Sequence, residues 1–114
     1  MRWTVTGLQA AIAKWQRKTF GSNHQNINGV YSHLLKEVYE LGEIIKCLKN
    51  YDCFTYQKNM NVLRYELADC FIMLVGLADA YKIDLEKATV EKMYINKTRQ
   101  WKTPDSDGVI EHKD

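Results

Sequence analysis

The sequence from Val62 to Tyr81 reads VLRYELADCFIMLVGLADAY, and this stretch decides the fold. Apolar residues recur at helical spacing through Leu63, Leu67 and Cys70, and from there the stretch is apolar on nearly every side. The run from Leu67 to Tyr81 has 15 residues and two aspartates, whereas a membrane span needs roughly 18 or more nearly uncharged residues. We therefore expect a core helix that must be covered on every side, and no membrane partner.

A second helix precedes this one between Val30 and Leu48. Its apolar residues follow steps of three or four, which draw one stripe down a helix. The members of that stripe are Val30, Leu34, Val38, Leu41, Ile45 and Leu48. The residues from Asn50 to Asn61 lose this period and predict a loop between the two helices.

Two shorter helices are expected nearer the ends of the chain. Thr6 and Gln9 form a capping-box pattern, in which each side chain bonds the other residue's backbone N–H. The first helix should therefore run from about Gly7 to Lys18. Asp84 has the chemistry of an N-cap, and it predicts a last helix that reaches about Trp101.

The composition favours one domain over residues 1–114. The chain is 46% apolar and 26% charged, which is ordinary for a globular protein. Six glycines and one proline are too few for many short strands. The predicted fold class is all-α: a four-helix bundle completed by oligomerisation, with residues 103–114 as a polar C-terminal tail.

The net charge and the cysteines indicate which partners and which cellular compartment to expect. The net charge is +2 with both signs interspersed, so a nucleic acid duplex is not an expected partner. The three cysteines, Cys47, Cys53 and Cys70, have no CxxC spacing, and no secretory signal begins the chain. We interpret them as small apolar fillers in a cytoplasmic protein.

Four acids carry the chemistry. Glu37 and Glu40 lie three residues apart on one predicted helix, and Glu66 and Asp69 repeat the spacing on the next. If the two helices pack antiparallel, the four carboxylates converge on a patch that repels itself without cations. Oxygen ligands suit Mg²⁺ or Mn²⁺. Single acidic pairs of this kind are usually solvated, but Asp69 stands directly before Cys70-Phe71-Ile72, so a buried carboxylate that needs a cation is expected there.

These acids also carry a family resemblance. Glu37-Val-Tyr-Glu40, 25 residues and Glu66-Leu-Ala-Asp69 resemble the ExxE…ExxD signature of the MazG-like, all-α NTP pyrophosphatases. The chain is similar in particular to the small phage and bacterial dATP/dGTP diphosphohydrolases of that superfamily. Further pieces that resemble the family are His33–Glu37 (HLxKE), Lys92–Trp101 (KMxxNxxRxW), Gly76–Ala78, Ile83–Leu85, Trp15-Gln16, Thr19–Gly21 and Asp107–His112.

The resemblance implies Mg²⁺-dependent hydrolysis of a (deoxy)nucleoside triphosphate to the monophosphate and pyrophosphate, on a homodimer or homotetramer. The enzyme would work in the cytosol of a bacterium or of a phage-infected host. It implies that the four acids are the metal ligands and the catalytic residues. The charges of substrate and site agree with this role. A negatively charged triphosphate can bind beside four carboxylates only through cations, and water bound to those cations can attack the α-phosphate.

A cationic face is expected to bind the polyphosphate. Lys92, Asn96 and Arg99 stand at i, i+4 and i+7 of the last predicted helix, which puts them on one face. His33 is a candidate for contact with substrate, or else a local hydrogen-bonding residue. Trp15 is a candidate for stacking on a base, or else a core residue of the first helix.

Other residues are weighed in the same way. Glu43 extends the acidic strip and is a candidate for a further ion or for a general base, or else is a solvated charge. Phe20 is likewise a candidate for stacking on a base, whereas Trp101 is expected to pack. His24 and His112 lack partners at ligand spacing and are not expected to bind metal.

Alternatives remain within and outside this enzyme class. The same chemistry would serve dUTP, dCTP or noncanonical nucleotides. A non-catalytic helical oligomer whose acidic face binds a basic partner is a second class of function. A carboxylate-bridged di-iron bundle is disfavoured, because it expects a Glu-x-x-His pair and both second positions here are acids.

Overall fold

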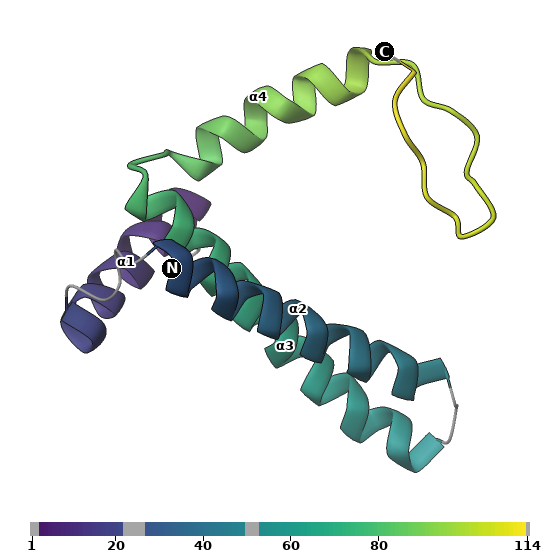
Figure 1. The fold of residues 1–114 in the computed structure, drawn as a ribbon, viewed down its shortest axis with the longest axis horizontal. Helices are drawn as coiled ribbons and strands as arrows, with labels where there is room; N and C mark the ends of the chain where they lie inside the picture. The colour runs from purple at the N-terminus through teal and green to yellow at the C-terminus, as the bar shows by residue number, and fades with distance from the viewer. Residues whose placement is uncertain (1–2, 22–26, 50–52, 114) are drawn as a thin grey trace.

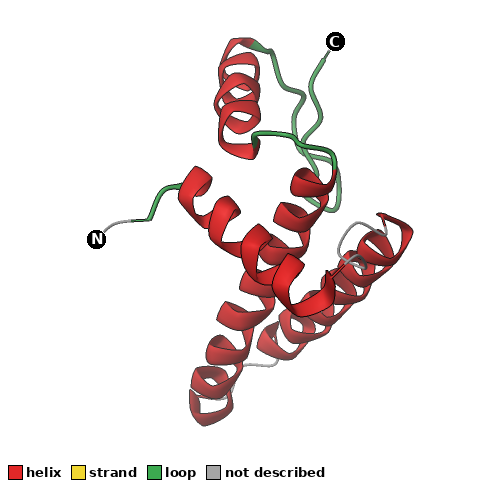
Figure 2. Ribbon diagram, turned by 90° about the vertical axis from the view of Figure 1, so that its left-hand side faces the viewer, coloured by secondary structure: helices red, strands yellow, loops and turns green. Residues whose placement is uncertain are grey.

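The described part of the chain forms four helices (Figures 1 and 2). A computed structural model describes residues 3–21, 27–49 and 53–113, with the side chains of 53–56 left aside. The helices are α1 (Val5–Phe20), α2 (Ile27–Lys49), α3 (Cys53–Ala80) and α4 (Leu85–Thr98). No strand forms in these described ranges, so the predicted all-α, four-helix class is confirmed.

Helices α2 and α3 form the longest packed pair. They run side by side in opposite directions, and both views show them as one arm of the molecule (Figures 1 and 2). The predicted apolar stripe of α2 is only partly correct: Ile44 is the buried residue of α2 at 8% exposure, whereas Val38 and Ile45 of the stripe are exposed at 48% and 44%. This pairing brings the middle of α2 opposite the middle of α3.

Helix α1 crosses the second half of α3. The side chain of Gln16 is buried there at 4% exposure, with Nε2 3.5 Å from the backbone oxygen of Ile72. Gly76 makes the close approach possible, since a Cβ at that position would lie 3.0 Å from Gln16 Nε2. The crossing thus depends on one missing methyl group.

A short turn sends α4 away from the α2–α3 arm. Lys82 has a left-handed backbone with φ 56°, and the N–H of Ile83 bonds Ala78 O at 2.8 Å, which closes the end of α3. Asp84 then caps α4 by accepting the N–H of Lys87 at 3.1 Å, so the predicted N-cap is confirmed. Both views show α4 diverging from α2 and α3, and it packs mainly against α1.

The buried core of one chain is small. Its apolar members are Ala13, Ile44, Cys70, Val75 and Ala78. Several large apolar residues of α3 and α4 stay exposed, among them Leu67, Leu74 and Tyr94. The cover expected on every side of α3 is therefore not supplied within one chain. Among the described helices, none is long and apolar enough to cross a membrane.

Three predicted boundaries are wrong. The N-cap of α1 is Thr4, whose Oγ1 accepts the N–H of Gly7 at 2.9 Å, whereas the Thr6 hydroxyl donates to Glu86. Helix α3 already begins at Cys53, inside the predicted loop from Asn50 to Asn61. A helix can form there because its backbone hydrogen bonds do not require a periodic apolar pattern. Residues 50–52 of the predicted loop lie outside the described residues. Helix α4 ends at Thr98.

The expected polar tail folds back on itself. An isolated bridge joins Trp101 to His112, and the N–H of Lys113 bonds Gln100 O at 3.0 Å. The indole Nε1 of Trp101 donates to the backbone oxygen of Asn96 at 3.0 Å, which ties this segment to α4. We call residues 100–113 the C-terminal hairpin.

Candidate metal and nucleotide site

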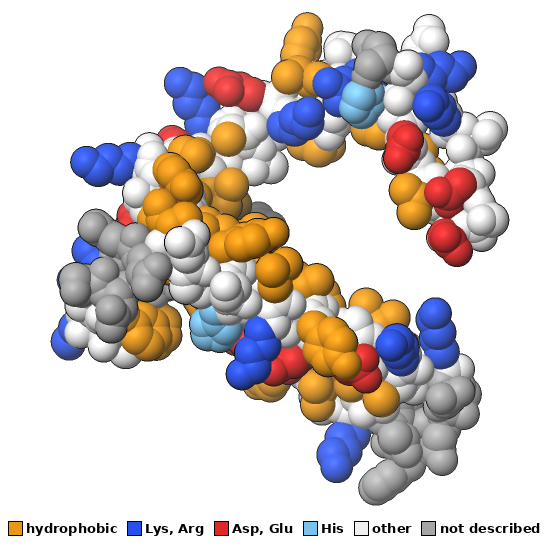
Figure 3. Space-filling view, in the orientation of Figure 1, with side chains coloured by type: hydrophobic (Ala, Val, Ile, Leu, Met, Phe, Trp, Pro, Cys, Tyr) orange, Lys and Arg blue, Asp and Glu red, His pale blue; other side chains and the backbone are white. Residues whose placement is uncertain are grey.

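Three carboxylates converge where α2 faces α3. Each of Glu37, Glu40 and Glu66 offers one oxygen, and these three oxygens lie within 4.8 Å of one another. The spacing of three residues along α2 puts Glu37 and Glu40 on one strip, and the antiparallel partner brings Glu66 opposite them. All three side chains are half-buried. The convergence predicted for these three residues is confirmed, and acidic side chains gather on the α2–α3 arm (Figure 3).

The carboxylates are not satisfied by the protein alone. Glu37 Oε2 and Glu66 Oε2 are buried, and neither has a hydrogen-bond partner in the part of the chain that the structure describes. Burial raises the pKa of Glu66 above its ordinary value of 4.5, and the negative charges of Glu40, Glu37 and Asp69 raise it further. A divalent cation would supply the partner that both oxygens lack, so the donor set fits Mg²⁺ or Mn²⁺.

Asp69 lies near this cluster but outside its closest group. Its charge contributes to the raised pKa of Glu66, yet its side chain is exposed. The prediction that Asp69 is buried is therefore wrong. The reason is that α1 and α2 cover only part of α3, and Asp69 stands on a face that no helix of the same chain covers.

The acidic cluster has one close neighbour on α2. His33 Nε2 lies 3.0 Å from Glu37 Oε1, one helical turn away, which fits the local hydrogen-bonding role. Glu43 instead lies 3.4 Å from Lys46 Nζ on the exposed surface. It is not a member of the converged group, and its contact is that of a solvated charge.

The predicted phosphate-binding face is only partly formed. Lys92 and Asn96 lie on α4, but Arg99 follows the helix end with extended backbone at φ −81° and ψ 154°, so the prediction of one helical face for all three residues is wrong. Arg99 is the C-cap of α4, with its N–H bonded to Asn96 O, and the C-terminal hairpin follows it. Asn96 Oδ1 is buried and has no partner in the described segments. Because α4 diverges from α2 and α3, one chain does not gather these residues around its own carboxylates (Figures 1 and 2).

The aromatic candidates lie at the surface. Trp15 is 51% exposed, and its ring meets that of Phe20 edge to face at a centroid distance of 5.5 Å. Trp15 is therefore not a core residue of the first helix; the buried residues of α1 are Ala13 and Gln16. The ring of Trp101 packs edge to face on His112 at 6.0 Å. His24 lies outside the described residues.

The cysteines differ from one another. Cys70 is buried beside the acidic cluster, and burial together with the charges of Glu37, Glu66 and Asp69 raises the pKa of its thiol. It is an apolar filler, as predicted. Cys47 is exposed, so the same prediction is wrong there. The side chain of Cys53 lies outside the described set.

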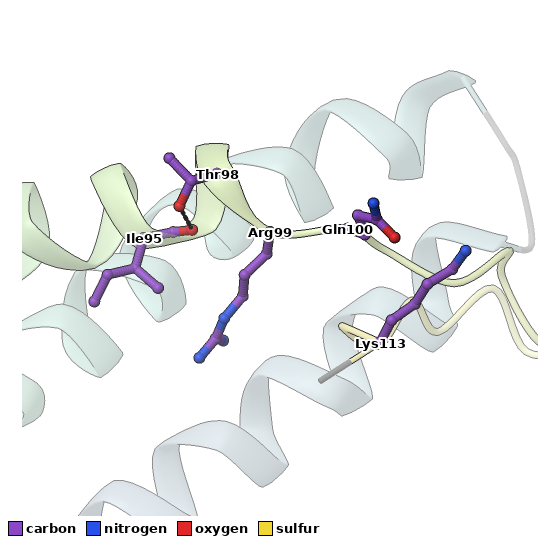
Figure 4. Close-up of a pocket in the computed structure, with 5 residues that line it drawn as sticks. All are labelled: Ile95, Thr98, Arg99, Gln100 and Lys113. Atoms are coloured by element: carbon purple, nitrogen blue, oxygen red, sulfur yellow. Dashed lines mark hydrogen bonds between the residues drawn. The ribbon is translucent and has the colours of Figure 1, made fainter.

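A second group of residues contains Arg99, which the sequence singled out, and Lys113, which it did not. A pocket of about 540 Å³ lies where α4 meets the C-terminal hairpin (Figure 4). Its lining residues are Ile95, Thr98, Arg99, Gln100 and Lys113. Lys113 had no signal in the sequence, because it stands in a polar stretch and reaches the pocket only through the fold of the hairpin.

The two carboxylate-bearing helices lie within a segment that matches a known protein family. Residues 25–100 match the MazG nucleotide pyrophosphohydrolase domain, and the chain belongs to this family. It is therefore an enzyme that hydrolyses phosphoanhydride bonds of nucleotides. The matched segment begins before α2 and ends just after Arg99, so it contains both acidic pairs and the candidate residues of α4.

A solved structure agrees with the family over the whole chain. It is a MazG-like pyrophosphohydrolase of cyanophage S-2L, bound to dGDP and three catalytic Mn²⁺ ions per active site. The likeness has a TM-score of 0.70 at 28% identity, and it covers 100% of this chain and 97% of that one. No curated protein matches the chain.

Proposed function

We propose that the protein hydrolyses a deoxynucleoside triphosphate, with dATP or dGTP preferred, to the monophosphate and pyrophosphate with Mg²⁺. The observation that carries this proposal is the convergence of Glu37, Glu40 and Glu66 within 4.8 Å, with two buried oxygens left unpaired. The similarity to a phage enzyme bound to dGDP and Mn²⁺ supports a deoxyguanine nucleotide and a divalent cation. Mn²⁺ is the expected substitute for Mg²⁺.

Four acids hold the cation in this proposal. Glu37, Glu40 and Glu66 form the inner group, and Asp69 extends it from the exposed side of α3. A bound divalent ion supplies charge neutralisation and a more acidic water. His33 holds Glu37 through its 3.0 Å contact and so fixes the orientation of that carboxylate. Attack of water on the α-phosphorus breaks the bond to the bridging oxygen and releases pyrophosphate.

The remaining candidates bind the nucleotide. Lys92 and Arg99 supply positive charge for the phosphates, and the planar fork of Arg99 can contact two phosphate oxygens at once. Asn96 brings a buried amide oxygen that lacks a described partner and can accept a hydrogen bond from the nucleotide. The exposed ring of Trp15 offers a surface on which a base can stack.

A panel of nucleotides tests the reaction. Purified protein is incubated with dATP, dGTP, dCTP, dUTP and noncanonical triphosphates, with Mg²⁺, Mn²⁺ or EDTA, and both products are identified. We expect monophosphate and pyrophosphate from dATP or dGTP, loss of activity in EDTA, and loss in Glu66→Gln. Glu91→Gln is the matched control, since Glu91 is exposed on α4. Release of single phosphate would overturn the proposed cleavage at the α-phosphate, and the absence of metal-dependent hydrolysis would overturn the proposal in favour of a binding module.

The active enzyme is proposed to be a homodimer or homotetramer that works in the cytosol of a bacterium or of a phage-infected host. The exposed Leu67 and Leu74 of α3 and the exposed Tyr94 of α4 support the assembly, because one chain leaves these apolar residues in water. A second copy would cover them and bring its α4 to the open side of the carboxylates. Sedimentation that shows a stable folded monomer at low micromolar concentration would contradict the assembly.

A further inference from the structure

Helix α4 is held by its own chain at its first turn. Leu85, Glu86 and Ala88 are half-buried, whereas every residue from Thr89 to Ile95 is exposed. The helix packs mainly against α1, and both views show it standing clear of the α2–α3 arm (Figures 1 and 2). The direction of α4 within the chain therefore depends on the contacts that hold its first turn.

The side chain of Gln9 on α1 bonds both sides of that turn. Its Nε2 donates to Ile83 O at 2.7 Å, and its Oε1 accepts the N–H of Leu85 at 3.1 Å. One amide thus bonds the backbone before and after Asp84, the residue that caps α4. Since hydrogen bonds weaken steeply when their angles are lost, a rotation of α4 at this turn would weaken at least one of the two.

Helix α1 is a fixed support for these bonds. Its second half crosses α3 with Gln16 buried at 4% exposure, and Arg17 pairs with Asp79 at 3.0 Å near the end of α3. Its first half adds another link to α4, because the hydroxyl of Thr6 donates to the carboxylate of Glu86. The contacts of α1 therefore connect the start of α4 to the body of α3.

The candidate phosphate-binding residues lie far along α4 from this support. Lys92 and Asn96 follow Leu85 by 7 and 11 residues. At a rise of about 1.5 Å per residue, Asn96 lies about 16 Å from the start of the helix, so a tilt of about 10° would move it by roughly 3 Å. Displacing a binding group by about 1 Å can already cost a large factor in rate.

We propose that Gln9 is a positioning residue for nucleotide binding, because its two bonds fix the direction of α4 and hence the places of Lys92 and Asn96. The inference rests on the proposed function, which gives those two residues their ligand, the polyphosphate of the nucleotide. Gln9 lies before residues 25–100, so the family match assigns it no role. In the proposed assembly, the direction of α4 decides whether it meets the carboxylates of the second copy.

Steady-state kinetics with the best deoxynucleoside triphosphate test this role. Gln9→Met keeps the length of the side chain and removes both bonds, and Gln57→Met, at an exposed position of α3, is the matched control. We expect Gln9→Met to raise KM roughly tenfold and to keep kcat within about threefold, because the binding groups of α4 are displaced while the α2–α3 carboxylates stay in place. A protein that is merely less stable would lose kcat through its unfolded fraction and keep its KM.

A double-mutant cycle tests whether Gln9 acts through α4. Lys92 lies about 10 Å along α4 from Leu85, a separation at which the effects of two substitutions usually add. If Gln9 positions Lys92, Lys92→Gln should raise KM much less in the Gln9→Met protein than in the parent. Independent effects of the two substitutions on KM would overturn the proposal. An unchanged KM in Gln9→Met would also overturn it, and would indicate that the second copy sets the direction of α4.

The direction of α4 can be measured without the reaction. Residual dipolar couplings of the backbone N–H groups report the angle between α1 and α4 in the protein without nucleotide. We expect Gln9→Met to change this angle or to average the couplings of α4, and to leave those of α2 and α3 unchanged. If the parent hydrolyses no nucleotide, the proposed function fails, and a changed angle still shows that Gln9 positions α4. If hydrolysis is normal and Gln9→Met keeps both the angle and KM, only the positioning role is wrong.

Discussion

Glu37 on α2 and Glu66 on α3 face each other across the helix pair, and each keeps one buried carboxylate oxygen without a described hydrogen-bond partner. Two such groups repel each other when both are ionised, so the site stores unfavourable electrostatic energy until a cation enters. The repulsion between these two carboxylates therefore links metal binding, the stability of the folded protein and the dependence of that stability on pH.

Glu66→Gln is expected to raise the Tm of the protein in EDTA. The substitution keeps the shape of the side chain and removes one of the repelling charges. In Mg²⁺ or Mn²⁺ the order should reverse, because the parent gains stability by binding the ion and the variant has lost a ligand. Thermal melts of both proteins, with Glu91→Gln as the control, measure this; equal Tm values for parent and variant in EDTA would contradict the repulsion.

The pH dependence of stability should follow the raised pKa of Glu66. Between the ordinary pKa of 4.5 and the raised value, the folded protein binds more protons at Glu66 than the unfolded chain does. The contribution of Glu66 to the free energy of unfolding is therefore present below pH 4.5 and is lost as the pH rises through the folded pKa. Denaturant melts in EDTA at several pH values should show the parent losing stability relative to Glu66→Gln as pH rises.

Gly76→Ala should destabilise the crossing of α1 and α3. The added Cβ would lie 3.0 Å from Nε2 and 3.1 Å from Oε1 of Gln16, which is itself buried. Overpacking costs about 1–3 kcal/mol, and alanine regains about 0.5–1 kcal/mol over glycine inside a helix, so we expect a net loss of up to about 2 kcal/mol in the free energy of unfolding. Gly42→Ala on α2 is the control, because nothing lies within 4 Å of its Cβ position, and it should gain about 0.5–1 kcal/mol. Denaturant melts compare the two; equal shifts would refute a tight crossing.

The amide of Gln9 should fix the start of α4. Its Nε2 donates to Ile83 O at 2.7 Å, and its Oε1 accepts the N–H of Leu85 at 3.1 Å, so it spans the turn on both sides of Asp84. Gln9→Ala is expected to cost about 0.5–1.5 kcal/mol, the net contribution of a hydrogen bond, because water can reach the two backbone groups that it leaves. Hydrogen exchange should increase in α4 more than in α2, whereas Gln57→Ala, at an exposed position of α3, should change neither.

The parts of this structure that depend on local chemistry were predictable, and those that depend on distant contacts were not. The cap at Asp84 and the convergence of Glu37 with Glu66 follow from helical spacing and antiparallel packing. Thr6 failed as a cap because its hydroxyl bonds Glu86, 80 residues away in the chain. Arg99 lies beyond the end of α4, where the C-terminal hairpin folds back, and no sequence pattern near Arg99 predicts that hairpin.

Asp69→Asn tests the fourth proposed ligand, whose side chain is exposed in one chain. Asp69 stands one helical turn from Glu66 and raises the pKa of that carboxyl, so it lies close enough to act on the same ion. If it binds the cation, the loss of one charged ligand should lower Mg²⁺-dependent kcat/KM by well over tenfold and raise the Mg²⁺ concentration needed for half activity. Asp107→Asn in the C-terminal hairpin is the control, since Asp107 is exposed and outside the cluster. Hydrolysis by Asp69→Asn within about threefold of the parent, a change in the barrier under roughly 1 kcal/mol, would leave the site with three carboxylate ligands.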